Sequence, residues 1–206
     1  MPILKSSLHG DPNVGLYGFA TDRYGICGIK DKQLEKALGV KFHFLPLYGT
    51  HLSGLFAAGN YYGIVATEFL GKEEKRHMIN ISDLLLLNTS YTAIGNLMLI
   101  NDNGIVISPL IRKYRKEIES FFSIRCEVST IAGIVVTGSV AAATSKGCIV
   151  HPKIKENERK IVEDVLKVPV SICTVSFGSP FVKSGLITNK NGAIVSEESS
   201  GIELCH

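Results

Sequence analysis

The residues of this sequence that could act as nucleophiles or metal ligands include five cysteines and six histidines. The cysteines are Cys27, Cys126, Cys148, Cys173 and Cys205, and no two of them have the CxxC spacing of a zinc or redox site. Four of the five lie in apolar, strand-like runs, where a free cysteine behaves as a small hydrophobic residue. The pattern therefore predicts neither a disulfide framework nor a metal site, and it favours a reducing compartment.

Phosphate-binding motifs are also missing from the sequence, which contains no GxxxxGK[ST] or GxGxxG segment. We therefore expect no cofactor. The formal net charge is +3, and four cations lie within the seven residues from Ile111 to Glu117. Such a run is typical either of a solvated helix face or of an electrostatic contact with a polyanion such as RNA, and the sequence leaves both open.

The hydrophobic residues are numerous enough for a folded core. They make up 45% of the chain, and the mean hydropathy is +0.20. The most apolar stretch, Ile131 to Ala143, is interrupted by Gly, Thr and Ser and is shorter than the roughly 20 residues of a membrane span. The N-terminus has no signal-peptide pattern, so we expect a globular, cytoplasmic protein without a membrane segment.

A glycine recurs along the chain at steps of 38 to 45 residues by subtraction, each time between a polar turn and an apolar run. The five positions are Gly25, Gly63, Gly104, Gly147 and Gly192. A period in this range indicates a repeat architecture. In the turns NDNG and NKNG, Asn and Gly are expected to form hairpins because both tolerate positive φ.

Each copy of the repeat begins with a short apolar or alternating run that predicts a strand. These runs are Pro2–Leu8, Val40–Leu47, Asp83–Asn88, Ile124–Ile131 and Val168–Val175. A second predicted strand carries a glycine, and the recurrent turn separates it from a third. The second-strand segments are Val14–Ala20, Ser53–Gly59, Ile94–Ile100, Thr137–Ala143 and Val182–Thr188.

Helical periodicity follows the third strand in four copies. One helix face carries Tyr114, Ile118, Phe121 and Phe122 in the third copy and Ile161, Val165 and Leu166 in the fourth. A shorter face in the first copy is followed by Gly39 as a stop signal, and Met78 and Ile79 mark a weaker helix in the second. We expect all of these stripes to pack on sheets.

The sequence thus predicts an α/β fold, a closed ring of five pseudo-symmetric ββ(β)α repeats, because closure removes exposed sheet edges. A propeller made only of strands does not explain the helices, and the chain has no Trp for a Trp-Asp signature. The expected single domain covers residues 1–206, with repeats near 1–39, 40–81, 82–123, 124–167 and 168–206. The last repeat lacks a full helix.

Several segments of the chain resemble the archaeal and eukaryotic translation initiation factor 6 family, the ribosome anti-association factors. The resemblance is carried by Ala93–Pro109, Ser145–Pro152, Val165–Val170 and Ser184–Ser196, and it is collinear over essentially the whole chain. It implies the pentein fold, a fivefold α/β propeller. It also implies a non-enzymatic protein that binds the intersubunit face of the large ribosomal subunit and blocks joining of the small subunit. A role in large-subunit maturation is a further implication.

The implied partners are ribosomal proteins and rRNA near the sarcin–ricin loop, bound by a monomer, with no DNA and no membrane. Carried over from the family, the ribosome-binding candidates are Asn60, Gly95, Asn96, Asn189, Asn191 and Gly192. Two of these residues have alternatives to ribosome binding. Asn60 is also explained by a purely local role in its turn, and the amide of Asn96 by hydrogen bonds to the backbone of a tight bend. The sequence departs from the family pattern at Leu55 and in the segment Val175–Ser179.

The same ring fold also occurs in guanidine-modifying enzymes with a Cys nucleophile, so that reading is the alternative. Cys205 in the last repeat and His151 in the fourth supply the residue types. Cys205 is the penultimate residue, however, and the acidic residues lie mainly in predicted helices rather than at a cavity that could hold a guanidinium. For His151 a corner between strand and helix is the simpler role, and we expect no enzymatic activity.

Overall fold

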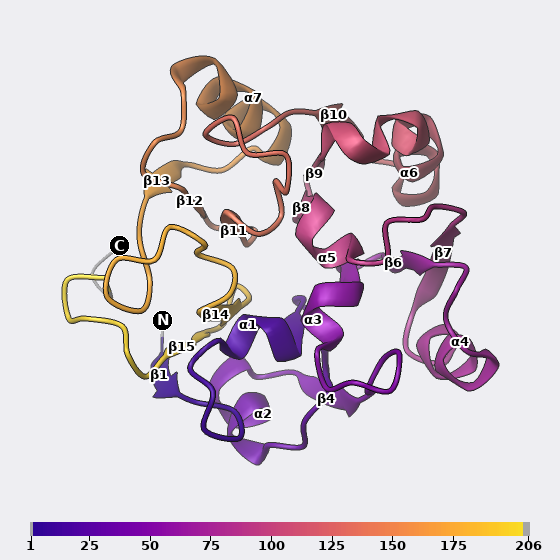
Figure 1. Ribbon diagram of the computed structural model, residues 1–206, viewed down its shortest axis with the longest axis horizontal. Helices are drawn as coiled ribbons and strands as arrows, with labels where there is room; N and C mark the ends of the chain where they lie inside the picture. Colours follow the sequence, from indigo (N-terminus) through magenta and orange to yellow (C-terminus); the bar gives the residue numbers. More distant parts are fainter. Residues whose placement is uncertain (1, 204–206) are drawn as a thin grey trace.

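The computed structural model describes residues 2–203. Figure 1 shows the elements arranged around a common centre, with the longer helices towards the outside. In chain order they are β1 (Ile3–Ser6), α1 (Val14–Tyr17), β2 (Gly18–Ala20), β3 (Tyr24–Cys27), α2 (Lys32–Leu38), β4 (Lys41–Phe44), α3 (Ser53–Phe56), β5 (Ala58–Gly59), β6 (Gly63–Thr67), α4 (Lys72–Ile79), β7 (Asp83–Leu87), α5 (Ile94–Leu97), β8 (Met98–Ile100), β9 (Gly104–Ile107), η1 (Pro109–Tyr114), α6 (Arg115–Phe122), β10 (Arg125–Val128), β11 (Ala141–Ala143), β12 (Cys148–Val150), α7 (Glu156–Leu166), β13 (Val170–Ile172), β14 (Leu186–Thr188) and β15 (Ala193–Ser196).

The strands form five three-stranded sheets of one kind. Sheet 1 contains β2, β3 and β4; sheet 2 contains β5, β6 and β7; sheet 3 contains β8, β9 and β10; and sheet 4 contains β11, β12 and β13. In each, the middle strand pairs antiparallel with the strand before it and parallel with the strand that follows the helix. A hairpin suffices for the first pairing, whereas the parallel pairing requires the helical crossover.

Sheet 5 contains β14, β15 and β1, so the first strand of the chain completes the last sheet. β1 pairs parallel with β15, with Ile3 opposite Ala193 and Ser6 opposite Ser196. The N-terminal strand therefore has the role that β4, β7, β10 and β13 have in the other sheets.

The core is divided among four clusters of buried hydrophobic residues, each between two neighbouring sheets and under one helix. The seam between sheets 5 and 1 is covered by α2, and the seam between sheets 1 and 2 by α4. The seam between sheets 2 and 3 is covered by α6, and the seam between sheets 3 and 4 by α7. In α7, Val162, Val165 and Leu166 are buried, as the helical stripe predicts.

The helix predictions are confirmed in position, and their facing is confirmed except at Ile79. Ile118 and Phe122 of α6 are buried, and Gly39 ends α2 in the left-handed conformation with φ 63°. In the weaker helix α4, Met78 is buried but Ile79 is 63% exposed. Among the described residues no helix follows β15.

The second-strand predictions were too long. The first half of each segment is a helical turn (α1, α3, α5) or an irregular turn, and only the last two or three residues form a strand. The turns contact one another by backbone: Gly15 N donates to Ser184 O, and Gly138 N donates to Asn96 O. This contact between neighbouring units, invisible in the local pattern, decides the conformation.

The expectation of positive φ at the hairpin turns was also wrong, because none of the five recurrent glycines has positive φ. Close packing surrounds four of them. A Cβ on Gly25 would lie 2.4 Å from the ring of Phe42 and one on Gly63 would lie 2.7 Å from the ring of Phe121, whereas at the other two it would meet helix backbone. A Cβ on Gly104 would lie 2.1 Å from the carbonyl oxygen of Val165 in α7, and one on Gly192 would lie 2.1 Å from that of Ala37 in α2. On Gly147 the nearest atom would be Pro169 O at 3.9 Å.

Candidate functional site

The first strand of each sheet has two ends that carry different groups of candidate residues. Gly95 and Asn96 lie in α5, directly before β8. Asn60, Asn189, Asn191 and Gly192 lie in the hairpin turns that follow β5 and β14. The structure therefore separates the six candidates into two sites, one on the short helices and one on the hairpin turns.

The hairpin turns are held by buried asparagines. Asn60 is 2% exposed, and its Oδ1 accepts hydrogen bonds from Tyr62 N at 2.9 Å and Gly63 N at 3.3 Å. Its Nδ2 donates to Asn101 O, in the turn of the next sheet, at 3.1 Å. The turn role considered for Asn60 is thus confirmed, and the same amide joins two sheets.

Asn189 repeats this arrangement and adds a helix contact. Its Oδ1 accepts from Asn191 N and Gly192 N, while its Nδ2 donates to Thr21 O and to Leu38 O, both at 2.9 Å. Asn191 Nδ2 also donates to Leu38 O, at 3.1 Å. Both amides therefore satisfy the last carbonyl of α2, which has no partner within the helix.

Asn101 and Asn103 do the same for α7. Their Nδ2 atoms donate to Leu166 O at 3.0 and 3.1 Å. The amides of these two turns thus cap the C-termini of α7 and α2. Asn101 and Asn103 were not among the candidate residues identified from the sequence. The signal that could have found them is the pattern Asn-x-Asn-Gly, which ends at Gly104 in one turn and at Gly192 in the other.

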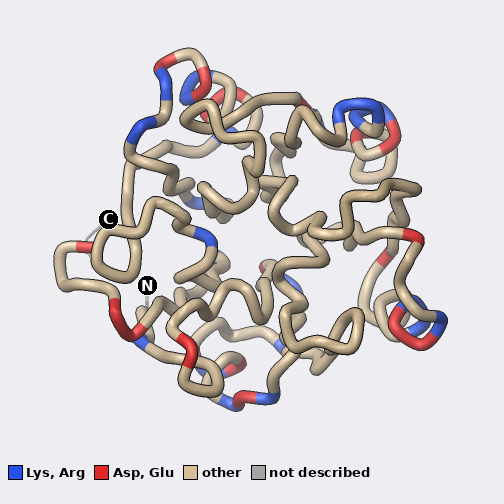
Figure 2. The backbone as a smooth tube through the Cα atoms, in the orientation of Figure 1, with Lys and Arg blue, Asp and Glu red and all other residues tan. Residues whose placement is uncertain are grey.

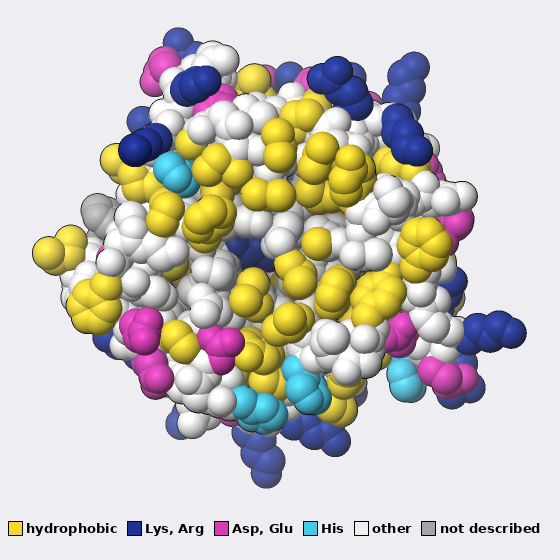
Figure 3. Space-filling model, in the orientation of Figure 1, with side chains coloured by type: hydrophobic (Ala, Val, Ile, Leu, Met, Phe, Trp, Pro, Cys, Tyr) yellow, Lys and Arg dark blue, Asp and Glu magenta, His cyan; other side chains and the backbone are white. Residues whose placement is uncertain are grey.

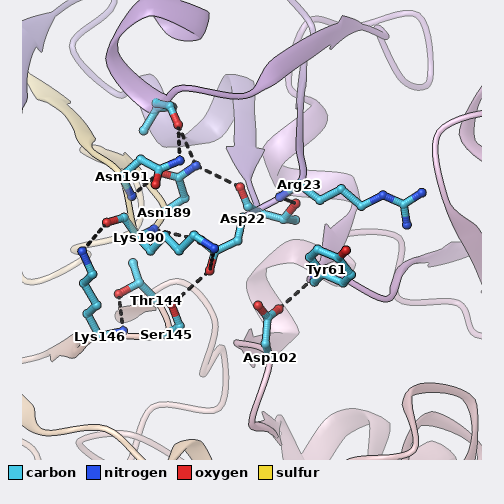
Figure 4. A network of polar contacts seen from close by, with 12 residues as sticks. Asp22, Arg23, Tyr61, Asp102, Thr144, Ser145, Lys146, Asn189, Lys190 and Asn191 are labelled. Atoms are coloured by element: carbon cyan, nitrogen blue, oxygen red, sulfur yellow. Dashed lines mark hydrogen bonds and ion pairs between the residues drawn. The ribbon is translucent and has the colours of Figure 1, made fainter.

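Charged residues surround these turns, and Figure 4 shows them with their contacts. Asp22 accepts hydrogen bonds from Lys190 N at 2.9 Å and from Ser145 Oγ at 3.0 Å. Asp102 accepts from Tyr61 N at 2.9 Å, and burial, together with the charge of Asp22, raises its pKa. The turn face is therefore a polar surface with both signs of charge, and it contains no nucleophile and base in contact within the described residues.

At the other end of the first strands, the short helices α1, α3 and α5 contact one another closely through their backbones. A Cβ on Gly95 would lie 2.1 Å from Gly54 O, so this glycine has a packing role between α5 and α3. Asn96 is half-buried, and its side chain lines a hollow of about 450 Å³. The hollow is also lined by Asn13, Leu16, Phe181 and Lys183.

Lys183 breaks the repeat at this hollow. In the other four units the corresponding position is a glycine, namely Gly15, Gly54, Gly95 or Gly138. The lysine is partly buried, and its Nζ donates a hydrogen bond to the carbonyl oxygen of Gly95 on the opposite side of the centre. Burial lowers the pKa of Lys183 to about 7. Aligning the five glycine-bearing segments would have revealed this residue.

The face that carries the short helices has a ring of apolar side chains around the hollow, a lysine, Lys183, inside it, and further charges at its edge. Figure 3 shows hydrophobic side chains around a central hollow, and Figure 2 shows most charged residues on the outer helices and loops. The basic run contributes Arg112, Lys113 and Lys116, which are exposed on η1 and α6. Arg115 instead donates through Nε to Cys126 O, at 2.6 Å.

Two buried cysteines and His151 lie in surroundings typical of residues with a structural role. Burial raises the pKa of Cys27 to about 11 and that of Cys126 to about 12, so both stay protonated. Nδ1 of His151 accepts a hydrogen bond from Lys153 N at 3.0 Å, which places this histidine at the expected strand-to-helix corner. Cys205 lies outside the described residues.

Within residues 2–203, no group of three or more His, Cys, Asp or Glu side chains is arranged to hold a metal. Over the same range, no helix combines the length and the hydropathy that crossing a bilayer requires.

Comparison with known proteins gives one consistent result. The eIF-6 family matches residues 3–206. The translation initiation factor 6 of Staphylothermus marinus is 31% identical over 218 residues, covering 99% of this chain and 95% of the relative. That of Thermococcus onnurineus is 31% identical over 217 residues, with the same coverage. That of Methanocaldococcus jannaschii is 28% identical over 215 residues, covering 98% of this chain and 94% of the relative.

Proposed function

Because the chain belongs to the eIF-6 family, a family of non-enzymatic translation factors, we propose that it binds the large ribosomal subunit on its intersubunit face. Bound there, it prevents the small subunit from joining by occupying the surface that the small subunit needs. The mechanism is steric, so it requires a rigid surface and no bond-making residue. We propose that the protein acts as a cytoplasmic monomer and also takes part in maturation of the large subunit.

The surface proposed for this contact is the front face, defined as the face that carries α1, α3, α5 and the central hollow. The observation that carries the proposal is the ring of hydrophobic side chains around the hollow, with Lys183 recessed inside it and most other charges at the periphery (Figure 3), since interface cores are depleted in charge and their rims are polar. Gly95 and Asn96 lie on this face, and Asn96 borders the hollow. A contact of about 800 Å² would suffice for a specific complex.

The turn-face candidates have a supporting role in this proposal. The amides of Asn60 and Asn189 are committed to backbone groups of neighbouring units, so they act by fixing the shape of the protein. Asn191 and Gly192 do so at the C-terminus of α2. Contacts from this end to ribosomal proteins would come from exposed neighbours such as Tyr61 and Lys190.

The basic run is proposed to guide the approach to rRNA near the sarcin–ricin loop. Arg112, Lys113 and Lys116 are exposed at the periphery of the molecule, where cations attract a polyanion from a distance. Such steering depends on ionic strength because the Debye length is only about 8 Å at physiological salt. The association rate should therefore fall with added salt more in the native protein than in a variant with these cations removed.

We also propose that the five units, with repeats ending near residues 39, 81, 123, 167 and 206, close into a pentein ring. Contacts between β2 and β5, β5 and β8, β8 and β11, β11 and β14, and β14 and β2 support this. The pairing of β1 with β15 supports it as well. A ring held in this way would present the front face as one rigid surface.

The test is co-sedimentation of the protein with isolated large subunits, followed by a subunit-joining assay. We expect co-sedimentation and reduced joining for the native chain. Asn96→Asp places a charge at the hollow with little change in shape and should weaken binding about tenfold. Asn157→Asp makes the same change on the exposed side of α7 and should bind as the native protein does.

Two results would contradict the proposal. If the native protein stays at the top of the gradient and joining is unaffected, the blocking function is wrong. If Asn96→Asp binds normally while Lys190→Glu loses binding, the contact surface is the turn face instead.

A further inference from the structure

Within residues 2–203, Lys183 is the only charged side chain that lines the central hollow of the front face. In Figure 3 the dark-blue atoms inside this hollow belong to a Lys or Arg side chain, and Lys183 is the lining residue of that type. A second, inner hollow of about 70 Å³ is lined by the first strands of all five sheets, and Lys183 lines this one as well. The lysine therefore lies where the two hollows meet.

The ammonium of Lys183 has no anionic partner in the described chain. Its Nζ donates a hydrogen bond to Gly95 O, which is a neutral carbonyl oxygen, and all other residues that line the two hollows are uncharged. None of the ion pairs formed within residues 2–203 includes Lys183. A lysine ammonium has three N–H donors, so the contact with Gly95 leaves two of them for a ligand.

The fold itself does not require a lysine at this position. The four equivalent positions are the glycines Gly15, Gly54, Gly95 and Gly138, and burying an ammonium without an anion costs free energy. The cost is reflected in the pKa of Lys183, which burial lowers to about 7. A bound anion would offset this cost by supplying a partner to the ammonium.

The walls of the central hollow favour a single carboxylate over a nucleic-acid backbone. An RNA strand carries one phosphate per nucleotide, and proteins neutralise several of them with separate cations, whereas no second cation of the described residues lines either hollow. Asn96 and Ser139 add uncharged polar groups to the wall, and Leu16 and Phe181 add apolar surface. One carboxylate could therefore accept a charge-assisted hydrogen bond from Lys183 and a further one from a neighbouring amide or hydroxyl.

We propose that the central hollow is a carboxylate-binding site, in which Lys183 pairs with one Asp or Glu side chain of a ribosomal protein. This inference rests on the proposed function, because the carboxylate would arrive with the surface that the front face contacts. The apolar ring around the hollow would exclude water from the pair. A desolvated charge pair at the centre of an interface contributes to both affinity and specificity.

The first test is the pH dependence of binding to isolated large subunits. The pKa of Lys183 is about 7 in the free protein and should rise when a carboxylate binds, so the affinity should fall as the pH rises through 7. Asp11, which accepts a hydrogen bond from the hollow residue Asn13, does not titrate in this range. Burial opposes its ionisation, but hydrogen bonds from Asn13 and Tyr17 prevail and lower its pKa. Co-sedimentation should show an affinity at least about tenfold lower at pH 8.5 than at pH 6.5.

Lys183→Met keeps the apolar stem and removes the charge, so it should fold at least as stably as the native chain, which circular dichroism and thermal unfolding check. At pH 6.5 it should bind large subunits at least about tenfold more weakly, and its affinity should lack the pH dependence that the native chain shows above pH 7. Lys160→Met is the matched control. The Lys160 side chain is 72% exposed on α7, so this variant should have the native affinity and the native pH profile.

A carbodiimide cross-link identifies the partner group. The reagent activates a carboxylate, the neutral Nζ of a lysine in contact attacks the carboxyl carbon, an amide bond forms, and the reagent leaves as a urea. Mass spectrometry of the native protein on large subunits should find Lys183 joined to an Asp or Glu of a ribosomal protein. An internal RNA phosphodiester gives no such product.

The outcomes separate this inference from the proposed function. If the native chain binds large subunits but Lys183→Met binds equally well with the same pH profile, the carboxylate site is wrong and the blocking function stands. If Lys183→Met loses binding but no cross-link forms at Lys183, the anion is an rRNA phosphate and the inference is also wrong. If the native chain does not bind at all, both fail.

Discussion

The seam between sheets 3 and 4 and the seam between sheets 4 and 5 are built from the same parts but differ in what fills them. The first contains α7, whose Val162, Val165 and Leu166 complete a buried cluster. The second has the matching glycine, Gly147, and is bordered by Glu203, which holds the position of Glu158 in its own repeat. Within residues 2–203 it contains a cavity of about 250 Å³ and no helix. The difference teaches that the recurrent glycine and the glutamate do not close a seam by themselves, because the buried cluster depends on the apolar side chains of the helix.

The largest expected effect comes from the two glycines. Gly104→Val would force its side chain against Val165 O and should lower the free energy of unfolding by about 3 kcal/mol or more. Gly147→Val meets open space and should change it by less than about 1 kcal/mol. Urea denaturation measures both. Equal losses of stability in the two variants would mean that the two seams are equally packed, which would contradict the comparison.

Truncation of the filling side chain should have the next largest effect. Leu166 is fully buried in the filled seam, so Leu166→Ala should cost about 2–4 kcal/mol. Ile149 borders the open cavity and is only partly buried, so Ile149→Ala should cost about 1 kcal/mol. If the free energy of unfolding falls as much in the Ile149 variant as in the Leu166 variant, the two seams are equally well packed and the comparison is wrong.

Lys183, in the fifth unit, gives a pH-dependent prediction. Its pKa is lowered to about 7 in the folded protein and has its ordinary value near 10.4 in the unfolded chain, so the unfolded state binds more protons between these pH values. Stability should therefore rise with pH over this window. Lys183→Met keeps the apolar stem, should be more stable than the native protein by about 1–2 kcal/mol at pH 7, and should lose most of this advantage by pH 10. An advantage that is constant from pH 7 to 10 would contradict the burial of the ammonium.

The smallest effects on stability are expected at Glu158 and Glu203, whose carboxylates accept hydrogen bonds from Lys155 N and Ser200 N. Burial opposes ionisation of Glu203, but hydrogen bonds from Ser200, Thr174 and Gly178 prevail and lower its pKa to about 2. Its contribution is present above pH 4.5 and is lost as the pH falls towards 2. Glu158 has a lowered pKa for the same reasons.

Glu158→Gln should therefore cost about 1 kcal/mol at pH 7, because it weakens the start of a packed helix. Glu203→Gln should cost less, because the turn that it holds is not followed by a packed helix in the described chain. Thermal unfolding at pH 7 and pH 3 measures both, and both differences should shrink at pH 3. A larger loss for Glu203→Gln would contradict the comparison.

Much of this fold follows from local patterns. The helical stripe at Val165 and Leu166, the stop at Gly39 and the hairpin position of the recurrent glycines depend on residues close in sequence, and the structure confirms them. The short helices α1, α3 and α5 could not be predicted, because contact between units such as Gly54 and Gly15 determines them. Likewise, the reason for glycine at position 104 lies in α7, about sixty residues away.

The candidate site was predictable only in part. The family resemblance identified Gly95 and Asn96, which lie on the front face, and the turn asparagines, which do not. Sequence alone could not separate these two groups, because both lie within a few residues of a strand and only the direction of that strand places them at opposite ends. Lys183 was missed because a lysine in a polar segment has no local signal of burial.

The pairing of β1 with β15 has a consequence for how the nascent chain acquires its structure. Ile3 and Ala193 are separated by 190 residues (193 − 3), so β1 leaves the ribosome long before its partner exists. At synthesis rates of about 5–20 residues per second, the first strand waits about 10–40 s with an unpaired edge. Sheets 1 to 4 can form in order of synthesis during this time, whereas sheet 5 must form last. The joining of the two ends of the chain is then the late step that separates a collection of folded hairpins and helices from the finished protein.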